Sequence, residues 1–401
     1  MSMYDVHDMT EQKNKHIRRK RIFRLTMTLI FIAVAASVYL THEIWLPKLR
    51  GLGKQYTTIV NDGRLAEGNF PIEINGGTEY QMDCSNKTVY VLSDSSIYQY
   101  NEEGGLIHRR QHTYTNTIMN TAGGMALLYE HGGNHFSVED RSGVLYSKEL
   151  EENIRLVRLS PEGYTAVVTT SLNYECEITI FDRDGNFIYE RKCVQRVDDI
   201  SFTNESRGCV ISYINAENGS LVTSVQKVTF TESAEKWTSP GLDTLGVSVF
   251  GFNGGAVVIG IDACGYVDDS GQIVSLYHYE GDFAGGDCED GKSAVIINSD
   301  ETRKYVMALF DGGGKEPLII GFNSPLVDVT VKDGLAYVMT HDAVLAYDFT
   351  GLLRSTASIN DSYTGFARSG GYIFLKSFSK IDRINYESYV GLWELSSGVS
   401  M

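Results

Sequence analysis

The sequence of 401 residues predicts an all-β protein, a β-propeller of eight four-stranded blades that follows one N-terminal transmembrane helix. Three observations support this prediction. An Asp-x-x-Gly pattern between β-rich runs recurs about every 40 residues, which is the length of a propeller blade. A second series of glycines, interleaved with the first, precedes short and wholly apolar runs. An uncharged stretch long enough to span a membrane lies near the N-terminus.

The N-terminal region separates from the rest of the chain by its charge. Residues 1–41 hold seven basic and three acidic residues, a net charge of +4, whereas the remainder holds 28 basic and 48 acidic residues, a net charge of −20. Leu25–Thr41 carries no charge, and Trp45 beyond it suits the far membrane interface. We therefore expect a basic tail over residues 1–24, a transmembrane helix over 25–46, a linker over 47–68 and the propeller over 69–401.

The same charge difference predicts the orientation of the chain. Basic residues stay on the cytoplasmic side of a membrane segment, so the tail is expected inside and the acidic propeller outside. A cleaved signal peptide is the alternative, because Ala33–Ala35 has the small-x-small form of a cleavage site. That site would lie inside the apolar run, which favours an uncleaved anchor. The predicted location is the cell membrane, with a single pass.

The Asp-x-x-Gly series is explained by hairpin chemistry. Asp caps the first position of a type I turn with its own side chain, and Gly takes the positive-φ position where the next strand begins. One unit lacks the pattern, and we expect the longer Phe230–Glu235 connection in its place. The turns occur at Asp140–Gly143, Asp182–Gly185, Asp268–Gly271, Asp311–Gly314 and Asp348–Gly351, with Asn101–Gly104 as a variant.

The second series marks the start of a buried strand in each unit. Its members are Gly124, Gly163, Gly208, Gly255, Gly291, Gly334 and Gly371, preceded by Asn86-Lys87. Apolar runs follow directly, such as Val257-Val258-Ile259 and Tyr337-Val338-Met339. A continuous apolar run indicates a strand buried on both faces, as in the second strand of a blade. Counting gives eight units, with seven blades and one irregular unit as the alternative; they begin near residues 79, 116, 153, 197, 242, 283, 325 and 361.

The ends of the chain are expected to close the ring together. The eighth unit ends after two or three strands, around Ile381–Tyr386, while Phe70–Ile74 is a strand-like segment that precedes the first unit. An unpaired strand edge is an aggregation hazard. We therefore expect Phe70–Ile74 to complete the last blade.

The chain resembles a known family at this point. The basic tail, the single membrane segment and the sequence QHTYTNTIMN…GGMALLYEHGG…FSVEDRSG…YTAVVTT…ITIFDRDGNFIYE are similar to an uncharacterised Gram-positive bacterial family with a domain of unknown function. That family falls within the quinoprotein-like and WD40-like propellers. The resemblance is clearest over residues 65–230 and implies a fold and a topology, but no activity. The blade-docking tryptophans of quinoproteins are absent, since Trp45, Trp237 and Trp393 are the only tryptophans, so no cofactor is expected.

Composition and motifs exclude several kinds of site. A net charge of −16 argues against a nucleic-acid partner, because no basic surface is available to neutralise phosphates. Gly286–Ser293 matches the spacing of a phosphate-binding loop, but a strand follows it instead of a helix, and it carries three acidic residues. We interpret it as an acidic turn between strands. Asp182–Gly185 similarly begins like a calcium loop, but Cys193 stands where the closing glutamate belongs.

Four histidines cluster in the sequence, namely His108, His112, His131 and His135. Residues four apart on a strand stand about 13 Å from each other, so neither close pair binds a metal alone. His112 and His131 are the candidate metal pair, because they could meet across strands. Surface or hydrogen-bonded histidines are the favoured interpretation, and no metal is expected.

All six cysteines follow the membrane segment. Cys176 and Cys193 are nearly equidistant from the 182–185 turn, so they are expected to face each other across one hairpin. An even count in an exported protein permits disulfides. Free thiols that fill buried strand positions are the favoured interpretation.

The sequence contains no recognisable catalytic set, so the catalytic residues are unknown. It favours a non-enzymatic, membrane-anchored propeller that binds an envelope protein or a glycan. One alternative is an extracytoplasmic enzyme, lyase-like or hydrolase-like, with its site in the central funnel. Another is an envelope sensor coupled to the short basic tail.

Overall fold

The computed structural model describes residues 70–74, 79–203, 206–230, 235–313, 316–360 and 362–385. The chain divides into two units, Met1–Gly63 and Arg64–Met401. The predicted tail (1–24), transmembrane helix (25–46) and linker (47–68) lie outside the described residues. Within the described ranges, no helix is long and apolar enough to cross a membrane.

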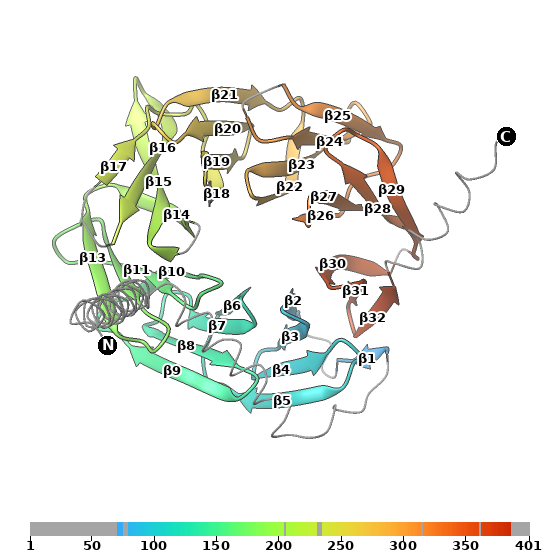
Figure 1. The fold of residues 1–401 in the computed structure, drawn as a ribbon, viewed down its shortest axis with the longest axis horizontal. Coiled ribbons are helices and arrows are strands. Elements are labelled where there is room, and N and C mark those ends of the chain that lie inside the picture. Colours follow the sequence, from blue (N-terminus) through green and yellow to red (C-terminus); the bar gives the residue numbers. More distant parts are fainter. Residues whose placement is uncertain are drawn as a thin grey trace, which may run out of the picture. The chain divides into compact units, whose positions relative to one another are not determined.

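The described part of the second unit is a β-propeller of eight four-stranded antiparallel sheets, arranged around a central axis (Figure 1). The prediction of eight blades is therefore confirmed over the alternative of seven. Blades 1 to 4 comprise β2 (Gln81–Ser85), β3 (Thr88–Leu92), β4 (Ser96–Asn101) and β5 (Leu106–Gln111); β6 (Thr117–Ala122), β7 (Met125–Glu130), β8 (His135–Asp140) and β9 (Gly143–Glu149); β10 (Ile154–Leu159), β11 (Thr165–Thr169), β12 (Cys176–Phe181) and β13 (Phe187–Cys193); and β14 (Arg196–Phe202), β15 (Gly208–Glu217), β16 (Ser220–Thr229) and β17 (Glu235–Thr238).

The remaining four blades follow the same plan, with the first strand of each blade innermost (Figure 1). They comprise β18 (Gly246–Phe252), β19 (Gly255–Gly260), β20 (Ala263–Asp268) and β21 (Ile273–His278); β22 (Asp282–Glu289), β23 (Lys292–Ser299), β24 (Lys304–Phe310) and β25 (Leu318–Phe322); β26 (Asp328–Lys332), β27 (Leu335–Met339), β28 (Ala343–Asp348) and β29 (Leu353–Ser358); and β30 (Tyr363–Ser369), β31 (Tyr372–Ser377), β32 (Lys380–Asn385) and β1 (Ile72–Glu73).

The eighth blade contains both ends of the propeller, as the sequence predicts. Its outer strand β1 comes from the start of the described chain and pairs with β32, with Ile72 opposite Ile381. The Ile74 amide donates a hydrogen bond to the Ser379 carbonyl at 2.8 Å. Ile72 is buried together with Ile381 and Val89 of blade 1, so closure of the ring also buries apolar surface. The strand edge that β32 would otherwise expose is therefore covered.

The second strand of each blade is the most deeply buried, which confirms the interpretation of the continuous apolar runs. All five residues of β3 and of β11, and all six of β19, are buried. These strands lie between two neighbouring blades, so each hydrophobic cluster includes side chains of adjacent sheets. Packing between blades, with side chains from consecutive sheets, forms the core.

The Asp-x-x-Gly turns join the third and fourth strands of a blade. In the turn of blade 7, Asp348 Oδ1 accepts hydrogen bonds from the Thr350 and Leu352 amides at 2.9 and 3.0 Å. Gly351 has a φ of 84°, a left-handed conformation that favours glycine. A Cβ there would lie 2.4 Å from Leu318 Cδ2 of blade 6, so this turn also receives the side chain of the preceding blade. Blade 4 lacks the pattern, and its last two strands are joined after Thr229, where the sequence predicts the longer connection.

The meander gives the propeller two distinct faces. Turns between first and second strands and between third and fourth strands lie at one end of every blade, which we name the turn face. Turns between second and third strands lie at the other end, together with the links from one blade to the next. We name that end the connector face.

Candidate functional site

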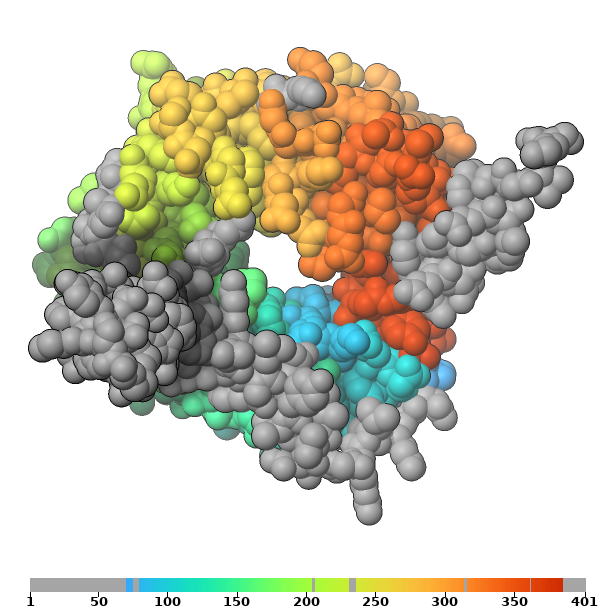
Figure 2. Space-filling view, in the orientation of Figure 1, coloured from blue at the N-terminus to red at the C-terminus, as the bar shows by residue number. Residues whose placement is uncertain are grey.

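The eight innermost strands surround the axis of the propeller, and Figure 2 shows an opening at the middle of the ring of blades. A propeller enzyme would be expected to place its reactive groups around this opening, so the polar side chains of the innermost strands are the first candidates for a site. Four carboxylates among them contact neighbouring strands: Asp199 is buried, Asp287 and Asp328 are half-buried, and Asp83 is exposed.

Asp83 in blade 1 and Asp287 in blade 6 have equivalent surroundings. Each is followed by a cysteine whose amide donates to Oδ1, at 2.7 Å for Cys84 and 2.8 Å for Cys288. Each accepts a threonine hydroxyl of the next blade at Oδ2, from Thr121 and Thr330 respectively, both at 2.8 Å. The protein around each carboxyl removes part of its hydration and so raises the pKa of both Asp83 and Asp287, and the charge of Asp287 raises the pKa of Asp83 further. These groups therefore connect adjacent blades.

Asp199 of blade 4 connects three blades. Its Oδ1 accepts Arg158 Nε of blade 3 at 2.8 Å, and its Oδ2 accepts the Val249 amide of blade 5 at 3.0 Å. The side chain of Asp199 is almost fully buried, and burial raises its pKa although the Arg158 charge opposes this. Asp328 has a similar role between blades 7 and 8, because its Oδ2 accepts the Phe366 amide at 3.1 Å.

Asp198, unlike the four carboxylates above, forms no hydrogen bond to a neighbouring blade among the described contacts. It occupies the irregular register between Val197 and Asp199 in β14. Its Oδ2 is buried and has no hydrogen-bond partner among the described residues. Burial, together with the adjacent charge of Asp199, raises the pKa of Asp198 to about 6.

The histidines predicted as a possible metal pair lie on the connector face of blades 1 and 2. His112 Nε2 is 3.1 Å from the Ser93 carbonyl, and its ring lies 6.0 Å from that of Tyr114. The Tyr114 ring in turn stacks on His135, centroids 6.1 Å apart. His131 contributes its amide to the Asn116 carbonyl. Within the described ranges, no group of three or more His, Cys, Asp or Glu side chains is arranged to hold a metal ion.

The segment that matches the spacing of a phosphate-binding loop is the hairpin between β22 and β23. Asp290 has a φ of 50° and Gly291 a φ of 79°, so the two residues form the turn. Asp287 and Glu289 accept hydrogen bonds from Val331 and Asp333 of blade 7. The interpretation of this segment as an acidic turn between strands is confirmed.

The sequence over residues 67–384 matches the model of a family of unknown function, DUF5711. The chain belongs to this family. No curated protein sequence matches it. The fold of the DUF5711 chain is similar to BamB from Moraxella catarrhalis, with 13% identity, a TM-score of 0.52, and coverage of 78% of this chain and 98% of BamB.

Two further solved structures share the fold of the DUF5711 chain. The computationally designed protein Ika8 is 13% identical, with a TM-score of 0.60 and coverage of 79% of this chain and 100% of Ika8. Sqt1 of Saccharomyces cerevisiae is 10% identical, with a TM-score of 0.58 and coverage of 79% and 98%. At these identities the likeness shows the fold alone, a propeller of the WD40 and BamB type.

A surface that sequence reasoning missed lies on the connector face of blades 3 to 5 of the DUF5711 chain. Several apolar side chains are exposed there, most strongly Leu172 (88%), Val194 (80%) and Leu221 (57%). Tyr174, Val247 and Ile261 complete the set, which we name the apolar loop set. The available sequence signal was the unusually long β-rich run of residues 208–229, which forms the two ten-residue strands of blade 4.

The β15–β16 hairpin gives this surface its most prominent element. The inner strand β14 pairs with β15 only as far as Ile214, so Asn215–Glu217 continue past it. Residues from Ala216 to Leu221 at the tip are exposed. The tip is therefore held by its own cross-strand pairing and presents its side chains to solvent.

Proposed function

We propose that this DUF5711 protein is a membrane-anchored, extracytoplasmic propeller that acts as a non-catalytic binding module for another protein of the cell envelope. The observation that carries the proposal is the apolar loop set on the connector face of blades 3 to 5. Exposed apolar side chains gathered on one face are typical of protein interaction sites. Four carboxylates of the inner strands accept hydrogen bonds from the neighbouring blade, which favours a structural role for these groups over catalysis.

The chemistry of the loop set favours a protein over a glycan as the partner. Leu172, Val194 and Leu221 are aliphatic, and such side chains pack against apolar surface of another protein. The charge of −20 outside residues 1–41 indicates a partner with basic residues at its rim. Electrostatic attraction acts mainly on the association rate, so association should slow as salt rises.

Site-specific photo-crosslinking in intact cells tests this function with the full-length protein. A photoreactive residue would replace Val194 or Leu221, and in the matched control it would replace Leu352 on the turn face, which is 57% exposed like Leu221. We expect both connector-face sites to crosslink to the same envelope protein and the control to give no product. Crosslinking to a glycan, or equal products from both faces, would contradict the proposal.

The anchored orientation rests on the uncharged segment Leu25–Thr41 and on the charge difference on its two sides. A cysteine introduced at residue 10 or at the exposed residue Asp300 would be treated on intact cells with a membrane-impermeant thiol reagent. We expect labelling at 300 and protection at 10 until the cells are lysed. Labelling at 10 in intact cells would reverse the orientation.

An enzymatic function is the alternative, and the environment of Asp198 is the observation that favours it. A half-buried carboxyl with a pKa raised to about 6, whose Oδ2 has no hydrogen-bond partner among the described residues, has properties of a general acid. Turnover of a small molecule by the wild type that Asp198→Asn abolishes without any loss of thermal stability would replace the binding function by this one.

A further inference from the structure

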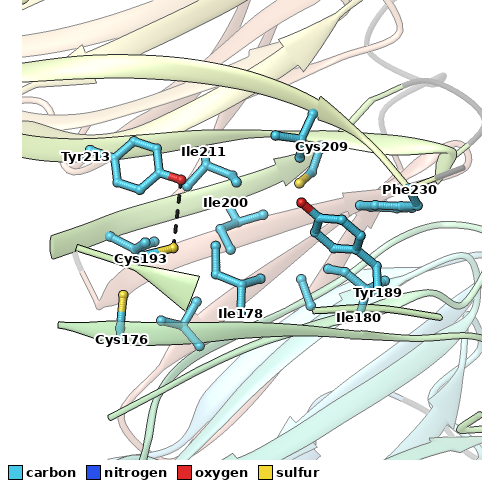
Figure 3. Close-up of a cluster of buried hydrophobic side chains, with 14 residues drawn as sticks. Cys176, Ile178, Ile180, Tyr189, Cys193, Ile200, Cys209, Ile211, Tyr213 and Phe230 are labelled. Atoms are coloured by element: carbon cyan, nitrogen blue, oxygen red, sulfur yellow. Dashed lines mark hydrogen bonds between the residues drawn. The ribbon is translucent and has the colours of Figure 1, made fainter. Parts of the chain in front are cut away.

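Two cysteines of blade 3 lie directly opposite each other on neighbouring strands. Cys176 opens β12 and Cys193 closes β13, and the antiparallel register pairs their Cα atoms. Figure 3 shows the two sulfur atoms close together at one end of the buried cluster. Directly opposed residues of antiparallel strands have Cα atoms about 4.5–5.5 Å apart, and a disulfide needs about 4.4–6.8 Å. The backbone is therefore already placed for an S–S bond.

The surroundings of the pair also favour thiol chemistry. The Cys193 thiol donates a hydrogen bond to the Cys176 sulfur, which lowers the pKa of Cys176, and the nearby charge of Arg155 acts in the same direction. The same hydrogen bond, with burial, raises the pKa of Cys193. Cys193 Sγ also lies 3.9 Å from the Tyr213 hydroxyl (Figure 3). Cys176 is therefore the more readily ionised thiol of the two, and the thiolate is the reactive form of a cysteine.

No other cysteine of the described strands is arranged in this way. Cys84 lies opposite Val89, Cys264 opposite Ile259 and Tyr277, and Cys288 opposite Ser293. Cys209 lies in the same hydrophobic cluster as the pair, but its cross-strand neighbours are Phe202 and Val228. Burial raises the pKa of the Cys209 thiol to about 12, as expected for an inert core residue.

We propose that Cys176 and Cys193 form a reversible disulfide by thiol–disulfide exchange with an external disulfide. All six cysteines are free thiols in the structure. The proposal does not depend on the binding function, because it concerns strands within one blade.

The exchange takes place in two balanced steps. The Cys176 thiolate attacks one sulfur of R–S–S–R, which forms a mixed disulfide Cys176–S–S–R and releases R–S⁻. Cys193 then loses its proton, and its sulfur attacks the Cys176 sulfur and displaces the second R–S⁻. The two protein thiols lose two electrons and two protons, and two molecules of R–SH are formed.

Access to the pair depends on the link between blades 3 and 4. Cys176 and Cys193 are 0% and 4% exposed, but Val194, the next residue, is 80% exposed. The Cys176 thiol lies 3.7 Å from the Gln195 carbonyl, so this link covers the sulfur. Displacement of Val194 and Gln195 would expose the pair without disturbing β12. The oxidised form would fix the end of β13, because the new bond closes the strand pair at its open end.

The test uses the reduced full-length protein in detergent. It would be incubated with oxidised glutathione in one arm and with an oxidised Cys-x-x-Cys oxidoreductase in the other, then alkylated and mapped by peptide mass. We expect the loss of two hydrogens and a peptide pair joined through Cys176 and Cys193. If the Cys176–Cys193 disulfide forms with only one of the two oxidants, that result identifies which kind of external disulfide reacts with the pair. Cys209→Ser is the matched control, since it removes an equally buried thiol of the same cluster and should leave the disulfide yield unchanged.

Two results would overturn the proposal. One is retention of six alkylated thiols in both arms while the urea-unfolded protein is oxidised under the same conditions. The other is a disulfide that joins any other pair. Cys176→Ser and Cys193→Ser should each abolish the linked peptide, and Cys193→Ser should stop at a mixed disulfide on Cys176. That trapped species is informative even if a variant is less stable, because it reports which sulfur attacks first.

Discussion

Blades 4 and 7 carry out the same structural plan in different ways. Blade 7 has strands of five or six residues and an Asp-x-x-Gly turn whose glycine receives Leu318 of blade 6. Blade 4 lacks this turn, has two ten-residue strands, and exposes the tip of their hairpin on the connector face. In blade 7 the repeated turn glycine Gly351 lies against the neighbouring blade. Blade 4 departs from the repeat at a hairpin tip whose side chains are exposed, and this is the part of the blade that we propose binds a partner.

The two blades also differ in how their inner strands are held. Asp199 in blade 4 forms a buried ion pair with Arg158 and also accepts the Val249 amide, so it joins blades 3, 4 and 5. Asp328 in blade 7 accepts the amides of Phe366 and Val329, and no cation pairs with it among the described ion pairs. Removing one member of a buried ion pair leaves the other charge uncompensated, whereas removing a neutral contact does not.

The largest effect is therefore expected for Asp199→Ala. It leaves the Arg158 guanidinium and the Val249 amide without their acceptor, and we expect a loss of about 3–5 kcal/mol in the free energy of unfolding. Asp328→Ala is the control in blade 7, with an expected loss of about 1–3 kcal/mol for the unmet amides. Urea unfolding measures both. Equal losses would show that the ion pair adds nothing to blade 4.

Two turn glycines, one in each blade, test the same comparison. Gly351→Ala in blade 7 forces a side chain into a left-handed conformation and against Leu318, and we expect a loss of about 2 kcal/mol. Gly219→Ala, at the tip of the blade 4 hairpin, has a similar φ of 88° but meets no atom within 4 Å. Its expected loss is about 1 kcal/mol, from the backbone alone. A larger loss at Gly219 than at Gly351 would mean that the hairpin tip is packed.

The regular features were predictable because they depend on local residue patterns. The turns at Asp182 and Asp348 and the buried run after Gly255 each follow from a few adjacent residues. The closing strand at Ile72 was predicted differently, from the incomplete last unit and the hazard of an unpaired strand edge. The contacts across blades were not predictable, because Asp199 meets Arg158 and Val249 from 41 and 50 residues away. The opposition of Cys176 and Cys193 was predicted, since it depends only on distance from one turn.

Substitution of Asp198 is expected to change the free energy of unfolding by a smaller amount, and to raise it instead of lowering it. Its folded pKa of about 6 lies above that of the unfolded chain, so the folded state binds more protons between about pH 4 and 6. The contribution of this group to stability is therefore largest below that window and falls as the pH rises through it. Asp198→Asn removes the penalty, and we expect a gain of about 1 kcal/mol at pH 8, discounted because the side chain is partly exposed.

This gain should become much smaller near pH 4, where the wild-type carboxyl is neutral in the folded state and only about half ionised in the unfolded chain. Thermal unfolding at pH 4, 6 and 8 measures it. Asp328→Asn is the matched control, since burial also raises the pKa of Asp328 to about 6 while its two oxygens accept backbone amides. An amide side chain offers one acceptor oxygen instead of two, so this control should lose stability at pH 8. A gain in stability for both variants would show that burial of the carboxyl alone decides whether the substitution stabilises the protein.

The smallest effect on stability, and the sharpest test of the comparison, is expected for Leu221→Glu at the tip of the blade 4 hairpin. The side chain is 57% exposed, and its strand partner Ala216 is also exposed, so the substitution should change the free energy of unfolding by no more than about 0.5 kcal/mol. If blade 4 departs from the repeat in order to bind a partner, the same substitution should weaken that binding at least tenfold, because it places a charge in an apolar contact. Leu352→Glu in the turn face of blade 7 is equally exposed and should leave both stability and binding unchanged. The association and dissociation rates of both variants with the crosslinked partner would be measured. Unchanged rates for Leu221→Glu as well as for Leu352→Glu would exclude blade 4 from the interface.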